Sequence, residues 1–306
     1  MADALTDILD SIRMRGSIFS RAALTAPWGF ESGTTSAGMF HAVVRGRAWA
    51  TLADGGRPVA LERGDMVLMP FGDNHLMTDQ PERATRPIGE VSTTDRRGMG
   101  HLVVDGDGAD TSLICGTVAF EPAGAHPVLS VLPRLIRVQD TTGASARLIE
   151  DLIRMIADEV DAPVAGSEAV VARLTDVLVV YALRNYINTL ADGEGGWMGG
   201  LRDPVIAEAL GHIHRRPDHP WTVAGLASTV GLSRSAFHHR FRDAVGETPS
   251  DYLTRWRVHL AGRLLREERF SVAAAGRQVG YQTEASFSNA FLRVMGVRPG
   301  AYKRAA

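Results

Sequence analysis

A segment of about thirty residues occurs twice in the last third of this 306-residue chain. The first copy runs from Thr222 to Tyr252 and the second from Ser271 to Tyr302, 49 residues apart at first and 50 after one insertion. The matching pairs are Thr222 and Ser271, Val223 and Val272, Ala224 and Ala273, Val230 and Val279, Gly231 and Gly280, Phe237 and Phe287, Phe241 and Phe291, Gly246 and Gly296, Pro249 and Pro299, and Tyr252 and Tyr302. A repeat that keeps caps, turn glycines and an aromatic pair predicts a duplicated structural unit.

Each copy has the pattern of a helix-turn-helix, spanning residues 222–246 and 271–296. A hydroxyl residue caps a short helix, and a glycine follows at its end, where a left-handed residue is needed. Ser233, or Gln282-Thr283 in the second copy, is placed to cap the next helix. Phenylalanines four residues apart then share the buried face of that helix. A protruding second helix beside a tight turn suits entry into the major groove of DNA.

Further helices are predicted around the two units. The stretch from Pro249 to Glu267 carries large side chains every four residues, as expected for an amphipathic helix that separates the units. Asp203-Pro204 supplies the cap and first residue of another helix before them. Major-groove faces recur about every 34 Å along a duplex, so a rigid spacer would let one chain contact two adjacent groove segments.

The charge distribution agrees with a DNA partner. Residues 201–306 hold 16 Lys and Arg against 9 Asp and Glu, whereas residues 1–200 hold 17 against 26. The net charge of −2 therefore hides a basic region joined to an acidic one. Basic side chains gain affinity for DNA by releasing counterions from phosphates.

Residues 203–306 resemble the DNA-binding domain of AraC/XylS-family transcription regulators. The residues that carry the resemblance are Ala227, Gly231, Ser233, Phe237, Arg240, Phe241, Gly246, Pro249, Tyr252, Arg257, Ala261, Leu264, Leu265, Val279, Gly280, Phe287, Ser288, Phe291, Gly296, Pro299 and Tyr302. The resemblance implies two helix-turn-helices that bind promoter DNA, usually to activate RNA polymerase. The positions implied to contact DNA are Arg234, Ser235, His238, His239 and Arg242 in the first unit, and Thr283, Glu284, Ser286 and Asn289 in the second. Arg234 and Arg242 suit phosphates, and the others suit base edges.

The first two-thirds of the chain predict a different architecture. Short β-rich runs alternate with Gly, Asp and Pro, which is typical of an antiparallel barrel or sandwich. Gly64 to His75 resembles the second motif of the cupins, with its glycines, proline and histidine in register. The position of the first-motif glutamate is occupied by Met39, and no His-x-His precedes it. We therefore expect a cupin-like sensor without catalysis, and name no catalytic residue.

Two kinds of ligand remain open for this barrel. Three histidines and a thiol, His41, His75, Cys115 and His126, have the ligand types of a zinc site, although their spacing matches no compact zinc signature. The alternative is a buried cysteine with histidines hydrogen-bonded in the core. A barrel of this kind also commonly encloses a small-molecule cavity, for which the candidate effector-binding residues are Trp28, Phe40, Trp49 and His75.

The region between barrel and DNA-binding domain is predicted to be helical. Apolar stripes in residues 144–191 favour a dimerisation segment, with packing against the barrel as the alternative. Residues 192–202 are rich in glycine and predict a flexible linker. We expect a homodimer in which the barrel, residues 1–143, controls how the DNA-binding domain is presented.

These observations predict an α+β multidomain protein: a cupin-like antiparallel β-barrel with a helical dimerisation segment, then an all-α domain with two helix-turn-helices. The expected function is sequence-specific transcription regulation under a small molecule or metal. An effector-independent dimeric regulator and a cupin enzyme joined to a DNA-binding domain stay open. A single cysteine, no apolar run of membrane-spanning length and no signal-like N-terminus favour a cytoplasmic protein without a membrane partner.

Overall fold

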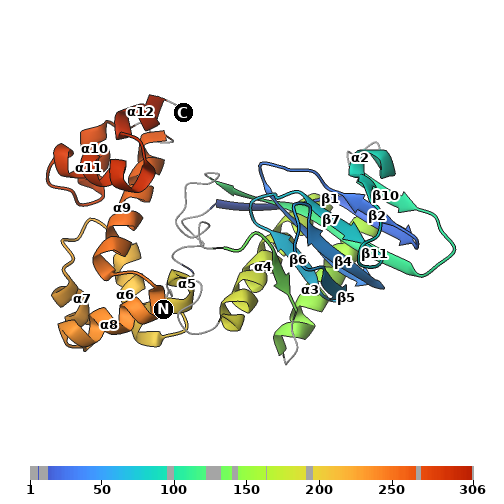
Figure 1. Ribbon diagram of the computed structural model, residues 1–306, viewed down its shortest axis with the longest axis horizontal. Helices are drawn as coiled ribbons and strands as arrows, with labels where there is room; N and C mark the ends of the chain where they lie inside the picture. Colours follow the sequence, from blue (N-terminus) through green and yellow to red (C-terminus); the bar gives the residue numbers. More distant parts are fainter. Residues whose placement is uncertain are drawn as a thin grey trace. The chain divides into compact units, whose positions relative to one another are not determined.

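The structure is a computed structural model, which describes residues 6, 13–94, 100–121, 132–139, 144–162, 164–190, 196–266 and 270–304. The chain forms two compact units (Figure 1). The first comprises Met14–Phe120 with Pro133–Tyr186, and the second consists mainly of Ile187–Ala306. This division agrees with the predicted separation of a β-rich N-terminal domain from a helical C-terminal domain.

Two β-sheets form the first unit. The seven-stranded sheet has the order β12-β6-β3-β11-β1-β10-β9, and the five-stranded sheet has the order β5-β4-β7-β2-β8. The strands are β1 (Arg13–Thr25), β2 (Gly29–Glu31), β3 (Gly38–Arg45), β4 (Arg47–Leu52), β5 (Val59–Glu62), β6 (Met66–Met69), β7 (His75–Thr78), β8 (Arg86–Pro87), β9 (Ser92–Thr94), β10 (Gly100–Val104), β11 (Asp110–Glu121) and β12 (Ile136–Val138), with the short helix α2 (Ile88–Val91) before β9. Most pairs are antiparallel as predicted, but β1 with β10 and β2 with β8 are parallel.

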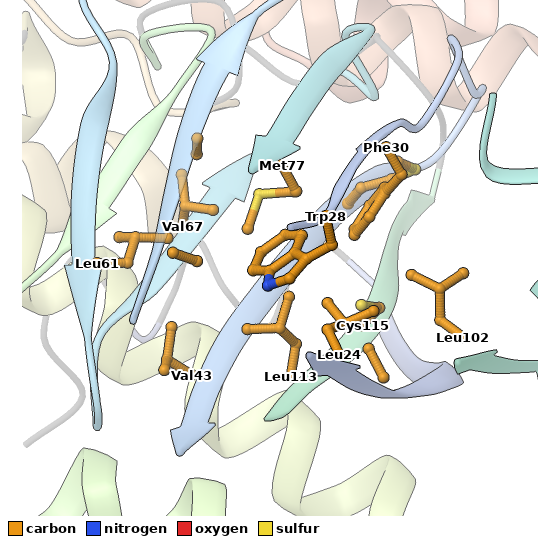
Figure 2. Packing of buried hydrophobic residues seen from close by; sticks show 14 of the residues in the cluster. Leu24, Trp28, Phe30, Val43, Leu61, Val67, Met77, Leu102, Leu113 and Cys115 are labelled. Carbon is orange, nitrogen blue, oxygen red and sulfur yellow. The ribbon is translucent and has the colours of Figure 1, made fainter. Parts of the chain in front are cut away.

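Alternation along the strands divides the buried residues of this unit between two faces. One apolar cluster fills the space between the sheets and takes side chains from both (Figure 2). Its larger members are Leu24, Trp28, Phe30, Met39, Val43, Leu61, Val67, Met69, Met77, Leu102, Leu113 and Cys115. The register of β3 sets Cys115 opposite His41 on one side and Val67 opposite it on the other. His41 therefore lies in the middle of the seven-stranded sheet.

Two helices, α3 (Ala144–Asp161) and α4 (Ser167–Thr189), lie against this unit (Figure 1). Their buried side chains include Ile149, Ile153, Ile156, Leu178, Val179 and Leu183. An Arg21–Asp161 ion pair at 3.0 Å joins β1 to α3, and the amide of Gly16 donates to Asp176 of α4 at 2.9 Å. Packing on the barrel, the alternative to dimerisation, thus accounts for one face of each helix.

The second unit is entirely helical over its described residues. Its helices are α5 (Trp197–Gly200), α6 (Pro204–Arg215), α7 (Val223–Thr229), α8 (Arg234–Val245), α9 (Pro249–Arg266), α10 (Val272–Gln278), α11 (Glu284–Met295) and α12 (Pro299–Arg304). Trp197 and Met198 of α5 are buried, and α5 contacts α8. The DNA-binding unit therefore begins before residue 203, because part of the predicted linker packs into its core.

The predicted caps and turns are present. Thr222, Ser233, Ser271 and Thr283 each accept a hydrogen bond from a backbone N–H of the helix that follows. Asp203 caps α6 in the same way, with Pro204 as its first residue. The glycines that close the turns and helices, Gly231, Gly246, Gly280 and Gly296, all have positive φ. Among the described residues, no helix is both long and apolar enough to cross a bilayer.

Candidate DNA interface and barrel interior

The two predicted recognition helices, α8 and α11, are built alike. Each has twelve residues, begins after a hydroxyl cap and ends at a left-handed glycine. Phe237 and Phe241 of α8 are fully buried, as are Phe287 and Phe291 of α11. In each pair the rings lie about edge to face, with centroids 5.6 and 5.5 Å apart. This packing fixes which face of each helix is turned toward solvent.

The solvent face of α8 carries most of the residues predicted to contact DNA. Arg234, Ser235, His239 and Arg242 are exposed, and His238 is half-buried. The helix holds three arginines against one aspartate. A cationic helix face of this kind attracts phosphates and raises the local affinity for a duplex.

The solvent face of α11 has a different chemistry. Glu284, Ser286 and Asn289 are exposed, but the hydroxyls of Thr283 and Ser286 are engaged at the cap. Thr283 Oγ1 accepts from the Ser286 amide at 3.1 Å, and Ser286 Oγ donates to the Thr283 carbonyl at 2.9 Å. Leu292 is 37 % exposed on the same helix. Within its bounds α11 has one glutamate and one arginine.

The first helix-turn-helix is braced by an ion pair between α8 and the cap of α6. Arg240 Nε and Nη2 donate to the carboxylate of Asp203 at 2.6 and 2.9 Å. Burial acts to raise the pKa of Asp203, but hydrogen bonds from Arg240 and from two α6 amides outweigh it and leave that pKa lowered. One carboxylate thus caps α6 and orients α8.

The spacer helix α9 connects the two helix-turn-helices through an arginine at its middle, Arg257. Arg257 Nε donates to the carbonyl of Pro217 and its Nη2 to the carbonyl of His219, both at 2.7 Å. Its guanidinium also lies 5.8 Å from the ring centre of Tyr281, which follows the turn of the second unit. Burial lowers the pKa of Arg257. One half-buried cation therefore holds the loop before α7, the spacer and the second turn together.

The same contacts explain why the turn of the second helix-turn-helix requires a glycine. Gly280 has φ of 90°, and a Cβ on it would lie 2.6 Å from the carbonyl of Asp218 and 2.9 Å from Arg257 Nη2. Backbone conformation and lack of space both require glycine there. Gly231, the matching residue of the first helix-turn-helix, has open space around it.

In the barrel, three of the four predicted metal ligands lie in a row. His41 Nδ1 is 3.0 Å from Cys115 Sγ, and His41 Nε2 is 2.7 Å from His75 Nε2. His75 Nδ1 is 2.8 Å from the carbonyl oxygen of Asp73 and 2.9 Å from Ser32 Oγ. His41, His75 and Cys115 are fully buried. The fourth ligand, His126, lies outside the described residues.

The Asp73 carbonyl fixes the direction of these hydrogen bonds. A carbonyl only accepts, so His75 Nδ1 carries the proton and the Nε2 of a neutral ring must accept. His41 then donates from Nε2 and accepts at Nδ1 from the Cys115 thiol. Burial lowers the pKa of His41, with a contribution from His75, and burial also lowers the pKa of His75. Burial raises the pKa of Cys115 to about 12, so all three groups are neutral.

This geometry changes the prediction of a four-ligand zinc site. Cys115 and His75 lie at opposite nitrogens of the His41 ring, whose lone pairs diverge, so these three groups do not converge on one ion. Over the described part of the chain, no group of three or more His, Cys, Asp or Glu side chains is arranged to hold a metal. Among the described residues the contacts are those of the alternative, hydrogen-bonded core histidines, and because His126 lies outside them the four-ligand zinc site stays a prediction.

The four candidate effector residues do not share one face. Trp28 and His75 lie in the interior, with Trp28 stacked on Phe30 at a centroid distance of 6.2 Å (Figure 2). Phe40 is buried on the opposite face of β3, over Gly116. Trp49 points outward, since its neighbours Ala48 and Ala50 belong to the interior cluster. Phe40 and Trp49 are therefore not brought to the space between the sheets.

A cavity of about 320 Å³ lies elsewhere, between β3 and α3. It is lined by Val43, Val44, Arg45, Arg63, Gly64, Glu150, Ile153 and Arg154. Each of its arginines is already paired, with Asp110, Glu150 and Asp151 respectively. The cavity contains none of the predicted effector residues and offers no unpaired arginine to an anion.

Comparison with known proteins connects both halves of the chain to regulators. A cupin family model matches residues 3–188, and a helix-turn-helix domain model matches residues 226–305. A putative AraC-like transcription regulator of Streptomyces antibioticus is 32 % identical over 302 residues, which cover 99 % of this chain and 98 % of that protein. The chain belongs to the AraC-like transcription regulators. The regulator AlkR of Acinetobacter baylyi is 28 % identical over 99 % of both chains.

A solved structure resembles the C-terminal part of this AraC-like regulator. The DNA-binding domain of AdpA, in complex with a target DNA, is 31 % identical and covers 34 % of this chain and 92 % of that one, with a TM-score of 0.33. The named relatives are transcription regulators, and this chain matches a helix-turn-helix domain model, which agrees with the expected absence of enzymatic activity. The protein is thus a DNA-binding regulator with a cupin domain.

Two contacts and one exposed side chain of the regulator escaped the sequence analysis. Arg240 and Arg257 appear there only as family residues, because their partners lie about forty residues away in sequence. The exposed Leu292 was also missed. The repeat contained its signal, since an offset of 50 pairs Leu292 with Arg242 and reveals an apolar residue where the first unit has a cation.

Proposed function

We propose that this protein binds promoter DNA through α8 and α11 together and activates transcription by RNA polymerase, as a homodimer whose barrel responds to a small molecule. The observation that carries the proposal is the duplicated unit, with equivalent solvent-facing helices in one compact domain. The rigid connection through Arg257 supports simultaneous contact of both helices with one duplex. Activation and polymerase contact are supported by the family resemblance.

The barrel interior supports an uncharged effector. The buried residues between its sheets include a large apolar cluster, and the buried His41 and His75 beside it are neutral. The indole N–H of Trp28 is buried without a hydrogen-bond partner among the described residues. A buried donor without a partner is costly, and an oxygen of a bound molecule would satisfy it. We therefore place the effector beside Trp28.

The test has two parts. Selection of duplexes from a random library by the full-length protein is expected to yield a motif long enough for two successive major grooves. A thermal-shift screen of uncharged small molecules is expected to find compounds that raise the melting temperature of the native protein and lose this effect in Trp28→Phe. A motif without any stabilising compound would favour an effector-independent dimeric regulator, and no enriched motif at all would contradict sequence-specific binding.

A further inference from the structure

The two recognition helices can be compared position by position. Both have twelve residues, the same type of cap and the same buried pair of phenylalanines, so an offset of 50 relates equivalent positions. Arg234 corresponds to Glu284, His239 to Asn289 and Arg242 to Leu292. Since the backbones are equivalent, the helices differ in the side chains that they present, and these three positions are among the differences.

The first helix is suited to phosphates and the second is not. Arg234 and Arg242 are long cations that bind phosphates of any sequence. Glu284 is repelled by phosphates, and Leu292 offers them nothing. The one cation of α11, Arg293, lies in its last turn, and the helix has no cation at the two positions that suit phosphates in α8. The polar side chains of its first two turns are therefore left to act at the base edges.

Two side chains of α11 are free for that task. Among the exposed polar groups predicted to contact DNA, the hydroxyls of Thr283 and Ser286 bond to each other and to the cap. Glu284 and Asn289 are exposed and have no hydrogen-bond or ion-pair partner among the described residues. Glu284 is the first residue of the helix, the end that a helix-turn-helix directs toward base edges.

Their chemistry selects particular bases. A carboxylate only accepts hydrogen bonds, and in the major groove it pairs with the amino group of cytosine. An asparagine amide both donates and accepts, which matches N7 and the amino group of adenine. Five residues of helix rise about 7.5 Å, or roughly two base-pair steps of 3.4 Å. Given the proposed function, we infer that α11 recognises a C·G pair through Glu284 and an A·T pair through Asn289, about two base pairs apart.

The experiment repeats the duplex selection with full-length wild type, Glu284→Gln and Asn289→Ala, and then measures affinities for single-base variants of the wild-type motif. Glu208→Gln is the matched control, because it removes one exposed negative charge of the same unit from α6, away from the recognition helices. Melting temperatures establish that each variant is folded. Because the library is random, the selection does not require that the natural target be identified.

The wild-type motif is expected to contain C and A about two positions apart in one half. Glu284→Gln should move the preference at the C position toward A, because a glutamine amide pairs with adenine, and should reduce discrimination for C by about tenfold or more. Asn289→Ala should relax only the A position to a similar degree. The other half of the motif should not change.

Three results would overturn the inference. A wild-type motif without this C and A pair is the first, and an unchanged motif in both variants is the second. The third is an equal gain in affinity for every duplex in Glu284→Gln and in the Glu208→Gln control, which would mean that Glu284 only repels phosphates. Failure of wild type to enrich any sequence is a distinct result, because it would contradict the proposed function itself.

Discussion

His41 is the residue on which the polar interior of the barrel depends. Each of its nitrogens has one partner, and both partners are buried with it. Cys115, His41 and His75 are all neutral, and the directions of their hydrogen bonds assign each of their protons to a single atom. If either ring took up a further proton, the new N–H group would have no free acceptor, and its positive charge would be buried beside the other imidazole.

Acid should therefore destabilise the first unit. The folded-state pKa of His41 and of His75 is lowered from the ordinary 6.5, so below pH 6.5 the unfolded chain binds protons that the folded chain does not. Stability is expected to fall as pH decreases from about 6.5 toward the lower folded pKa, by up to about 1.4 kcal/mol for each unit of lowering. Denaturant unfolding between pH 7.5 and 5.5 measures this. His41→Asn should flatten the dependence, and His101→Asn, at an exposed histidine of the same unit, should not; equal slopes in all three proteins would contradict the assignment.

The Cys115 thiol is expected to be inert in the native protein. It is fully buried and its pKa is raised to about 12, so the reactive thiolate is absent at neutral pH. Ellman's reagent should label it only after denaturation. Cys115→Ala leaves His41 Nδ1 without a donor and should cost about 1–3 kcal/mol of unfolding free energy, whereas Cys115→Ser keeps a donor and should cost less. Rapid labelling of the native protein would show that this interior opens.

Within the DNA-binding unit, α9 sets the separation of the recognition helices, and Arg257 connects α9 to both helix-turn-helices. Arg257→Ala should leave affinity for a duplex with only the first half of the motif unchanged, and should weaken binding to the full motif by about 1–3 kcal/mol, because α11 is no longer held in register. Arg242→Ala is the control, since loss of a phosphate contact should weaken both duplexes equally. Gel-shift titrations on the two duplexes, and on a full motif with one inserted base pair, measure the effect. Equal losses on both duplexes in Arg257→Ala would mean that it acts through charge alone.

How far elements could be predicted from sequence depended on their periodicity. The limits of the four helices in the two repeats were predictable because each helix begins after a hydroxyl cap and is followed within two residues by a glycine, and because both copies carry these marks. The run from Phe40 to Val44 lies in β3, whose first six residues are all buried, so both faces of the strand are covered and no alternation of polarity marks the interior side. Phe40 and His41 were both candidates for the interior, although adjacent strand residues must face opposite ways.

Contacts between distant elements were the least predictable. Arg257 and Asp203 bond partners about forty residues away, and nothing local in the sequence indicates them. The row in the barrel was partly predictable, since the cupin-like motif ends at His75 and since His41 and Cys115 were named with it as candidate ligands. Its use as a hydrogen-bonded core rather than as a metal site required the ring orientations. Trp197 was assigned to a linker because its glycine-rich surroundings suggested one, yet it is fully buried.

At the scale of the whole molecule, each compact unit has a solvent-exposed surface that takes no part in its own packing. In the first unit the outer faces of α3 and α4 expose four large apolar side chains: Leu148, Met155, Val170 and Val177. They are seven residues apart on each helix, so each pair forms one stripe. This is the face on which the proposed homodimer depends, because the opposite faces are already packed on the barrel.

Dimerisation and DNA binding can be tested together through salt. Each phosphate neutralised contributes about −0.9 to the slope of log affinity against log salt concentration. The fragment Ile187–Ala306, which supplies most of the second compact unit, has one DNA-binding domain, and a full-length dimer on a double site has two, so the full-length slope should be about twice the fragment's. Val170→Glu with Val177→Glu places charges in the apolar stripe and should yield a monomer, by sedimentation, with the fragment's slope. Substitution of the exposed Arg57 by Glu, in the loop between β4 and β5 rather than on α3 or α4, should preserve the dimer and its slope. A full-length slope equal to that of the fragment, in a protein that sediments as a monomer, would contradict the dimer while leaving the DNA-binding unit intact.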